Sequence, residues 1–421
     1  TITATAILLS TPVALALSRN ISFVFLIAVC AVLVLPHVTS FIAKGANDRT
    51  NLRTRKFLPI NRATIAWLFF TVFASSSLLW TPELQRGWEA WLQFNVAIAV
   101  AAVCLLVICT DQRKLPQMHW AFIVALVVAS CLILWELNNG SPVRQALGGS
   151  TEPFRLNRAA VATAILAPLM FLTNNNLRHL ALKLAVVGLV WFTAFSSDSE
   201  SAKLAIVVIS VTLLVAQVVK PSFLLNLCFA GLLLSHALAP VLAWAAHAYI
   251  PYALLDVVGY PSQTVWLYIW SAHAAQIPDA FFLGQGIQAA SAATLTHPNV
   301  GNVTIPELGL TFHPLGFTHP HNFSIQIWYE LGLIGVALSS AVIVLAWQKL
   351  RELSANDAKV LSALLAGAWV VMWVSHGAWQ HWWWALLGIA GILFALLSNS
   401  NAVETANTDV TPATETEPMN H

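Results

Sequence analysis

The chain has 421 residues, of which 58 % are hydrophobic and only 9 % are charged, and its formal net charge is +2. This composition excludes an ordinary soluble globular protein, and the lack of any basic stripe argues against a nucleic-acid partner. Together with a mean hydropathy of +0.73, it predicts an all-α polytopic membrane protein in contact with membrane lipids.

Apolar runs long enough to cross about 30 Å of hydrocarbon recur along the chain, and we count about twelve of them. The first run is short and contains Pro12, but it lacks the basic leader and cleavage site of a signal peptide. We therefore predict nine transmembrane helices in residues 1–248 and three in residues 321–398. The predicted spans begin near Thr3, Ile21, Ala63, Trp88, His119, Arg158, Arg178, Ser201, Phe223, His321, Lys359 and Gln380.

The basic residues between the spans predict the orientation in the membrane. If the amino terminus is cytoplasmic, most of the 20 Lys and Arg residues lie on the cytoplasmic side. We therefore expect both termini in the cytoplasm, with residues 249–320 on the outer side. Residues 399–421 are acidic and Thr-rich, which predicts a disordered cytoplasmic tail.

Residues 249–320 form the longest connection, and long loops in compact proteins tend to be functional. Within it, "SQTVWLYIWSAHAAQ" (262–276) carries Trp266 and Trp270 four residues apart. This spacing predicts an amphipathic helix in the membrane interface. The Gly- and Pro-rich sequence that follows predicts short helices and turns, so we interpret the loop as a lid over the outer surface.

A second outer loop, residues 138–157, ends in "FRLNRAA", where the sixth span begins. Arg155 and Arg158 are three residues apart, flank Asn157 and share one helix face. The free N–H groups of a helix amino terminus bind phosphate or pyrophosphate, which predicts an anion site here. Snorkelling of the arginines to the lipid headgroups is the alternative. Lys203 follows "SSDSES" and either joins this site or pairs with one of those acidic residues.

The segment "THPHNFSIQIWYELGLIG" (318–335) opens the tenth span with polar residues. Asn322, Gln326 and Glu330 are each four apart and lie along one stripe of a helix. A carboxylate at this depth should face a cavity or a partner. The alternative is a packing role, in which these side chains bond to neighbouring helices. Gly332 and Gly335 permit close approach of another backbone.

His321 stands at the amino-terminal end of this helix, where the helix dipole disfavours an imidazolium. A neutral histidine could act as a general base on the outer face, or it could simply cap the helix or bond a loop carbonyl. His319 could orient His321 or contact a substrate, or only line the loop. The spacing of His313, His319 and His321 raises the question of zinc, but no acidic residue lies between them, so we expect no metal.

Four tryptophans, Trp379, Trp382, Trp383 and Trp384, lie in "SHGAWQHWWWALL" at the outer end of the last span. This pattern is typical of an aromatic belt, and stacking on a sugar or acyl chain is the second interpretation. The cationic residues at helix amino termini and the candidate base together predict a reaction on a lipid-linked, phosphorylated substrate.

The segment "HPHNFSIQIWYELGLIG" (319–335) resembles the signature of the bacterial O-antigen ligase and polymerase superfamily, in which a His-Asn pair precedes Gly-x-x-Gly. His321-Asn322 and Gly332-x-x-Gly335 fit that pattern. The segments "LNRAAVATAILAPL" (156–169) and "IWSAHAAQIPDAFFLGQGI" (269–287) resemble two further family segments, so the resemblance covers roughly residues 138–398.

The resemblance implies a fold like that of the GT-C membrane glycosyltransferases. It implies an O-antigen ligase that transfers a glycan from undecaprenyl diphosphate to a sugar hydroxyl of lipid A-core. This reaction would complete lipopolysaccharide at the periplasmic face of the bacterial inner membrane, without metal, ATP or another cofactor. His321 would be the base, Arg155 and Arg158 would hold the diphosphate, and Asn322 would orient the base or the glycan.

The chain departs from the family at two places. Many relatives have an arginine shortly before the equivalent of Trp270, where this chain has Gln263 and Trp266. Many also have a Ser-Arg or Ser-Lys at the start of the eighth span, where this chain has Ser199-Glu200 and then Lys203. Lys203, Arg86 or Arg144 could compensate. An O-antigen polymerase and a protein O-oligosaccharyltransferase are alternatives within the superfamily. A twelve-helix transporter is the alternative from another class, and it would predict internal symmetry and ionisable residues at the midplane.

Overall fold

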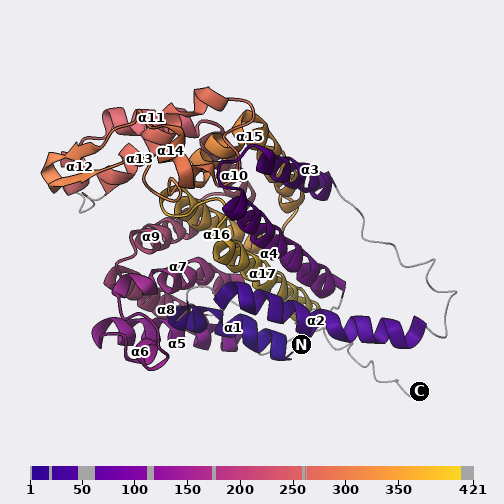
Figure 1. The fold of residues 1–421 in the computed structure, drawn as a ribbon. Helices are drawn as coiled ribbons and strands as arrows, with labels where there is room; N and C mark the ends of the chain where they lie inside the picture. The colour runs from indigo at the N-terminus through magenta and orange to yellow at the C-terminus, as the bar shows by residue number, and fades with distance from the viewer. Residues whose placement is uncertain are drawn as a thin grey trace, which may run out of the picture.

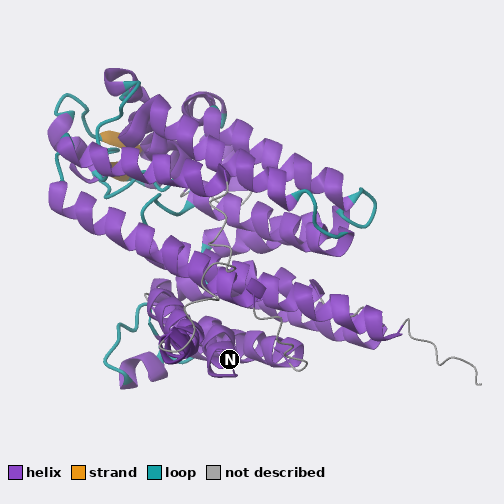
Figure 2. Cartoon of the chain, turned by 90° about the vertical axis from the view of Figure 1, so that its right-hand side faces the viewer, coloured by secondary structure: helices purple, strands orange, loops and turns teal. Residues whose placement is uncertain are grey.

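The computed structural model describes residues 2–18, 21–45, 62–110, 118–172, 177–257, 261 and 263–408, and helices make up most of them (Figures 1 and 2). The long helices in chain order are α1 (Ile2–Leu17), α2 (Ile21–Gly45), α3 (Arg62–Ser76), α4 (Leu84–Thr110), α5 (Met118–Asn138), α7 (Asn157–Leu166), α8 (Leu177–Ser196), α9 (Glu200–Val215), α10 (Pro221–Ala237), α11 (Ala239–Tyr249), α13 (Gln263–Ala275), α15 (Phe323–Leu350), α16 (Ala355–Val374) and α17 (His381–Thr408).

The two outer loops predicted from the sequence contain short elements. Among them are α6 (Pro142–Ala146), α12 (Tyr252–Val257), α14 (Ala293–Thr296), the 3₁₀ helix η3 (Pro153–Leu156), and an antiparallel pair of strands, β1 (Val303–Ile305) and β2 (Leu310–Phe312). The prediction of an all-α polytopic membrane protein is confirmed in its class. α17 extends to Thr408, into the predicted tail, and residues 409–421 lie outside the described part of the chain.

The predicted number of about twelve spans is not confirmed. A helix begins close to each predicted start, but among the described residues eight helices are long and apolar enough to cross a membrane. α1 and α9 have 16 residues each, and α10 meets α11 at a bend of 80°. Pro240 near the start of α11 has no N–H and disfavours a helical residue before it, which explains the bend.

The helices pack as a bundle whose outward faces are apolar. α16 packs against α9 and α10, α17 against α4 and α2, and α15 against α3 and α10. Large apolar side chains remain exposed on several helices, as at Phe69 (62 %), Phe192 (63 %) and Leu214 (69 %). Soluble monomers rarely expose so much apolar surface, whereas lipid solvates it. The pattern therefore fits a multi-pass membrane protein.

The two outer loops lie at the same end of the bundle, which we call the loop end and define by residues 138–157 and 250–322. In Figure 1, α6 and α12 to α14 lie at the left, whereas the amino terminus lies towards the right. The side of the membrane that each end faces stays a prediction. α13, predicted to lie in the membrane interface, packs against α11 and α15 and buries Leu267, Ile269 and Trp270.

α15 is a broken helix. Gly332 has φ 61° and ψ −162°, a conformation that is essentially restricted to glycine. The segment 281–286 lies against the break and satisfies the backbone groups that the break releases. The N–H groups of Leu333 and Ile334 donate to the carbonyls of Phe281 (2.8 Å) and Phe282 (3.2 Å), and those of Gln285 and Gly286 donate to Tyr329 (2.9 Å) and Glu330 (2.8 Å).

Two glycines make this contact between segment 281–286 and α15 possible. A Cβ atom on Gly284 would lie 2.3 Å from the backbone of Glu330, and one on Gly332 would lie 2.6 Å from the backbone of Phe282. No side chain fits at either position without moving backbone. The close approach predicted for Gly332 is therefore present, and the approaching backbone comes from the long loop.

Candidate active site

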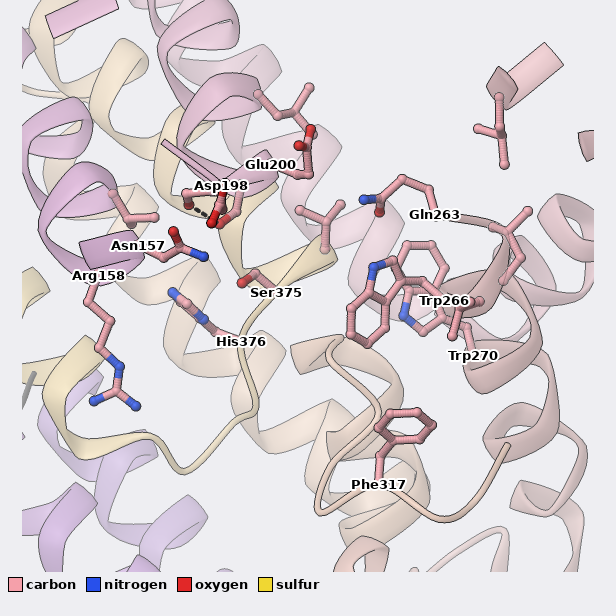
Figure 3. Close-up of a pocket in the computed structure, with 18 of the residues that line it drawn as sticks. Asn157, Arg158, Asp198, Glu200, Gln263, Trp266, Trp270, Phe317, Ser375 and His376 are labelled. Carbon is pink, nitrogen blue, oxygen red and sulfur yellow. Dashed lines mark hydrogen bonds between the residues drawn. The ribbon is translucent and has the colours of Figure 1, made fainter. Parts of the chain in front are cut away.

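A cavity of about 730 Å³ opens at the loop end (Figure 3). Its walls come from the amino terminus of α7, the turn between α8 and α9, α13, and the connection between α16 and α17. The polar lining residues include Asn157, Arg158, Asp198, Glu200, Ser375 and His376, and they face the aromatic side chains of Trp266, Trp270 and Phe317, the last of which comes from the loop between β2 and α15. Segments that are distant in sequence thus form one surface with an aromatic wall and a polar wall.

The amino terminus of α7 provides the cation in this cavity. Asn157 and Arg158 are its first two residues, but η3 runs directly into α7 and the N–H of Asn157 donates to the carbonyl of Phe154, so the free helix terminus predicted for the anion site is not present at Asn157. The guanidinium carbon of Arg158 lies 4.6 Å from the ring centroid of the buried Trp382. This cation–π contact holds the guanidinium at the cavity wall. The Oδ1 atom of Asn157 is buried and has no hydrogen-bond partner within the described structure.

The other predicted cationic residues do not line the cavity. Arg155 lies in η3, before α7 begins, and its Nε is 3.8 Å from the carboxylate of Glu152. Lys203 donates to Glu200 at 2.8 Å. Arg144 donates to the backbone carbonyls of Ala16 (2.9 Å), Leu17 (3.3 Å) and Ser150 (3.0 Å). Arg155 thus belongs to a 3₁₀ helix and Arg158 to an α-helix, a change of geometry that the sequence spacing did not reveal.

His321 is held in one tautomer by the backbone. Its Nδ1 lies 3.1 Å from the carbonyl oxygen of Ser375. Because a carbonyl only accepts, Nδ1 carries the hydrogen and the lone pair of Nε2 is the proton acceptor of the ring. Burial lowers the pKa of His321 to about 4, so the ring is neutral at neutral pH. This is the state a general base needs.

Three cavity-lining residues also contact His321. Its ring centroid is 4.2 Å from that of Trp266 and 6.2 Å from that of Phe317, and Ser375 bonds its Nδ1. His321 itself lies directly behind these side chains rather than among the lining residues. The structure therefore places His321 next to the cavity through three lining residues, Trp266 and Phe317 of the aromatic wall and Ser375 of the polar wall.

His319 fixes the backbone of His321. His321 has φ 53°, which is unusual for a residue other than glycine. Its N–H donates to Nδ1 of His319 at 3.1 Å, and Nε2 of His319 lies 2.9 Å from the side-chain amide of Gln380. The two imidazole rings lie 4.1 Å apart. A residue at positive φ persists where its surroundings determine it, and such residues gather at functional sites.

Asn322 caps α15. It is fully buried, its backbone is extended, and its Oδ1 accepts from the N–H of Ile325 at 3.0 Å. Asparagine is among the best residues for this position, and such a cap contributes about 1 kcal/mol. The His-Asn pair therefore has a structural logic: Asn322 starts the helix, and His321 is the last loop residue before it.

Gln326 and Glu330 join three segments. Glu330 is fully buried and accepts from Nε1 of Trp379 (2.5 Å), Nε2 of Gln326 (2.8 Å) and the backbone N–H groups of Gln288 (2.8 Å) and Ala290 (3.4 Å). Oε1 of Gln326 accepts from the N–H of Ala378 at 2.8 Å. The two side chains face protein partners, as a carboxylate at this depth should, but those partners are the long loop and the α16–α17 connection rather than the neighbouring helices of the packing interpretation.

Replacing Glu330 by glutamine is expected to destabilise the protein by about 1–3 kcal/mol, because the new amide points an N–H group at existing donors and leaves some unpaired. Thermal unfolding of the detergent-purified protein measures the change. Glu352→Gln is the matched control, since Glu352 is exposed and lies 3.4 Å from the exposed Lys349. Equal stability of the two variants would contradict a structural role for the Glu330 carboxylate.

His376 is a cavity residue that the sequence analysis missed. It lies between α16 and α17, lines the cavity, and is only 7 % exposed. Its ring packs edge-on against Trp382 (4.9 Å between centroids) and Trp383 (4.8 Å). The signal was present in "SHGAWQ", a polar break between apolar runs at the predicted outer side, but the tryptophans around it indicated a belt.

The aromatic-belt interpretation is wrong for three of these tryptophans. Trp379, Trp382 and Trp383 are buried, and they contact Glu330, Arg158 and His376 respectively. Hydropathy alone cannot distinguish a tryptophan at a lipid interface from one that supports a polar site, because both lie at the end of a span.

Four histidines at the loop end are neutral because they are buried. Burial lowers the pKa of His273 and His321 to about 4 and that of His376 to about 3, and it lowers that of His319 well below 6.5. In the unfolded chain each would titrate near 6.5. Their contribution to stability is therefore complete above pH 6.5 and is lost as the pH falls from 6.5 towards 4.

We expect the midpoint of thermal unfolding to fall steeply between pH 6.5 and pH 4, since each such histidine lowers the free energy of unfolding by up to about 1.4 kcal/mol per pH unit. A pH series of melting curves in detergent measures this. His273→Asn is expected to flatten the pH dependence, whereas His313→Asn serves as control. A melting midpoint that does not change across this range would contradict the burial of neutral imidazoles.

Within the described residues, no three His, Cys, Asp or Glu side chains are grouped so that they could hold a metal ion. His319 and His321 are adjacent, but the Nδ1 atom of each is engaged by backbone.

The fold and the site together define a helical multi-pass membrane protein with a polar cavity at one end of its bundle. No protein-family model matches the chain. It is similar to a protein of Rickettsia conorii named "Putative polysaccharide ligase", with 26 % identity over 274 residues, which cover 63 % of this chain and 64 % of that protein. A protein of Rickettsia felis with the same name is 25 % identical over 281 residues, covering 65 % of this chain and 66 % of that protein.

A third protein of that name, from Rickettsia bellii, is 27 % identical over 218 residues, or 51 % of each chain. The matched regions thus cover slightly less than two thirds of the length of the first two relatives. These findings support a distant relationship to proteins named as polysaccharide ligases, and they agree with the resemblance noted in the sequence.

Proposed function

We propose that the protein is an O-antigen ligase with a GT-C-like fold. It transfers a glycan from undecaprenyl diphosphate to a sugar hydroxyl of lipid A-core at the periplasmic face of the bacterial inner membrane. The observation that carries the proposal is the state of His321: a neutral imidazole whose Nδ1 donates to a backbone carbonyl, so that the lone pair of Nε2 can accept a proton, in a ring that contacts residues lining the cavity.

The reaction is a single displacement at the anomeric carbon. The acceptor hydroxyl oxygen forms the new glycosidic bond while the bond from the anomeric carbon to the diphosphate oxygen breaks, which inverts the anomeric centre. The proton of the hydroxyl goes to Nε2 of His321, and the diphosphate leaves with the bonding electron pair. No nucleotide is required, because the donor already contains a phosphate leaving group.

Arg158, the second residue of α7, neutralises the departing diphosphate in this proposal. A fixed positive charge stabilises an anion as it develops. Asn157 lines the same wall. Arg155 and Lys203 would reach the diphosphate only if they exchanged Glu152 and Glu200 for it. Asn322 supports the base through the helix it caps.

The test is a transfer reaction with the purified protein in detergent, undecaprenyl-diphosphate glycan as donor and rough lipopolysaccharide as acceptor, with and without EDTA. Glycosylated lipopolysaccharide that forms in EDTA supports the ligase. Extension of the lipid-linked glycan instead identifies a polymerase, and transfer to a protein acceptor identifies an oligosaccharyltransferase. Movement of the donor across a vesicle membrane with no covalent product would overturn the enzyme assignment in favour of a transporter.

A further inference from the structure

His376 is a cavity-lining group to which the proposed reaction gives no role. Its side chain is more than nine-tenths buried, yet its Nε2 atom has no hydrogen-bond partner in the described structure. A buried polar atom without a partner destabilises the folded protein. Such an atom calls for an explanation, and at the wall of a cavity a ligand atom provides one.

The ring orientation determines which ligand atom fits. Burial lowers the pKa of the His376 ring, the backbone of Ser375 raises it, and Nε2 has no hydrogen-bond partner in the described structure. When the hydrogen of the neutral ring is on Nδ1, Nε2 presents a lone pair. An anionic oxygen can bind Nε2 only after Nε2 gains a proton, because the imidazolium donates from both nitrogens.

Cationic and acidic groups face His376 from the surrounding elements. Arg158 approaches from α7, and His319 and His321 approach from the loop before α15. Asp198 and Glu200 belong to the same cavity at the α8–α9 turn, and Figure 3 shows His376 on the wall with Asn157, Asp198 and Ser375, opposite Trp266. Burial and Arg158 lower the pKa of His376 to about 3, so the ring is neutral while the cavity holds no anion.

An anion in this cavity would favour the protonated form of the His376 ring. An opposite charge within about 4–6 Å favours the charged form of a histidine. The same anion is attracted by the positive charge of Arg158, the second residue of α7. The cavity thus supplies two cationic donors for an anion that has several oxygens, provided one proton enters with it.

We infer that His376 binds the diphosphate of the donor together with Arg158, and that it takes up one proton when the diphosphate enters. This inference rests on the proposed function for the identity of the ligand. It adds a second diphosphate-binding residue to Arg158, at a position where the family resemblance assigned none. His376 remains distinct from His321, which receives the proton of the acceptor hydroxyl.

Binding of inorganic pyrophosphate to the full chain in detergent tests the inference by titration calorimetry. Experiments in two buffers with different ionisation enthalpies give the number of protons taken up. His376→Gln keeps an N–H donor near the position of Nε2 but does not titrate. Because pyrophosphate itself titrates, the informative quantity is the difference between the wild-type protein and this variant.

We expect the wild-type protein to take up more protons than His376→Gln, up to one more. Between pH 8 and pH 6 its affinity should rise relative to that variant by up to about tenfold per pH unit. His376→Ala should weaken binding by about 10- to 100-fold, the effect of losing one hydrogen bond to a charged group. His313→Gln is the control, because His313 does not line the cavity. Equal proton uptake by the wild-type protein and His376→Gln would overturn the inference.

The transfer reaction separates this inference from the proposed function. If it is correct, His376→Ala raises the KM for the lipid-linked donor at least about tenfold and leaves the KM for the acceptor unchanged. If the wild-type protein transfers glycan and His376→Ala has the same donor KM, the inference fails and the proposed function stands. If the wild-type protein transfers nothing but proton-linked pyrophosphate binding requires His376, the anion site stands and the proposed function fails.

Discussion

Replacing His321 by asparagine is expected to lower the rate of glycan transfer by about 10²- to 10⁴-fold, the contribution that a positioned general base makes. Asparagine is the most informative substitution, because His321 has φ 53° and asparagine adopts this left-handed conformation more readily than most other residues. The backbone before α15 therefore stays unstrained while the proton acceptor is removed. Turnover at saturating donor and acceptor measures the effect.

Two companion variants define what the His321 result means. His321→Ala removes the same imidazole but adds backbone strain, so it should match asparagine in activity and have a lower melting temperature. His313→Asn, in the same loop and outside the cavity, should transfer at the wild-type rate. A folded His321→Asn protein with full activity would show that another group removes the proton.

Introducing a methyl group at Gly332 or Gly284 is expected to abolish the folded protein. At Gly332 any other residue would have to adopt a strained backbone conformation, which lowers the stability of the folded protein by about 1–3 kcal/mol. The new Cβ would also overlap the backbone of Phe282, and a Cβ at Gly284 would overlap that of Glu330. Overpacking adds about 1–3 kcal/mol, and here the obstacle is backbone that hydrogen bonds hold in place. The yield of monodisperse protein after detergent extraction measures the outcome.

Gly231→Ala is the matched control for these variants. Gly231 lies within α10, and a Cβ there would have no atom within 4 Å. Alanine has the higher helix propensity, so this variant should be as stable as the wild type or more so. If Gly332→Ala is also obtained in normal yield with an unchanged melting temperature, then α15 does not require the break that the structure shows.

Local signals in the sequence predicted the helices well. Each apolar run produced a helix near its expected start, and the His-Asn pair marked the start of α15 because a capping asparagine is a local feature. The sequence analysis did not predict the bend between α10 and α11, although Pro240 is a local signal for it. A count of apolar runs measures composition, and it does not register where the backbone changes direction.

The candidate site depended on contacts between distant segments, and the sequence predicted it only in part. Arg158 was found because an arginine that opens a helix is visible locally. His376 was not found, since its environment comes from α7, α17 and the loop before α15. Trp266 was assigned to a lipid interface, but its ring lies 4.2 Å from that of His321. The spacing of residues along one helix does not show which other segment of the protein packs against them.

The pairing of segment 281–286 with the break in α15 limits how this part of the long loop can move. Four backbone hydrogen bonds and two from Gln288 and Ala290 to Glu330 fasten it to a helix of the bundle. Separation of the loop from α15 along that edge would require all six to break together. Residues 281–290 therefore follow any displacement of α15 in the membrane, and the long loop inherits the position of that helix.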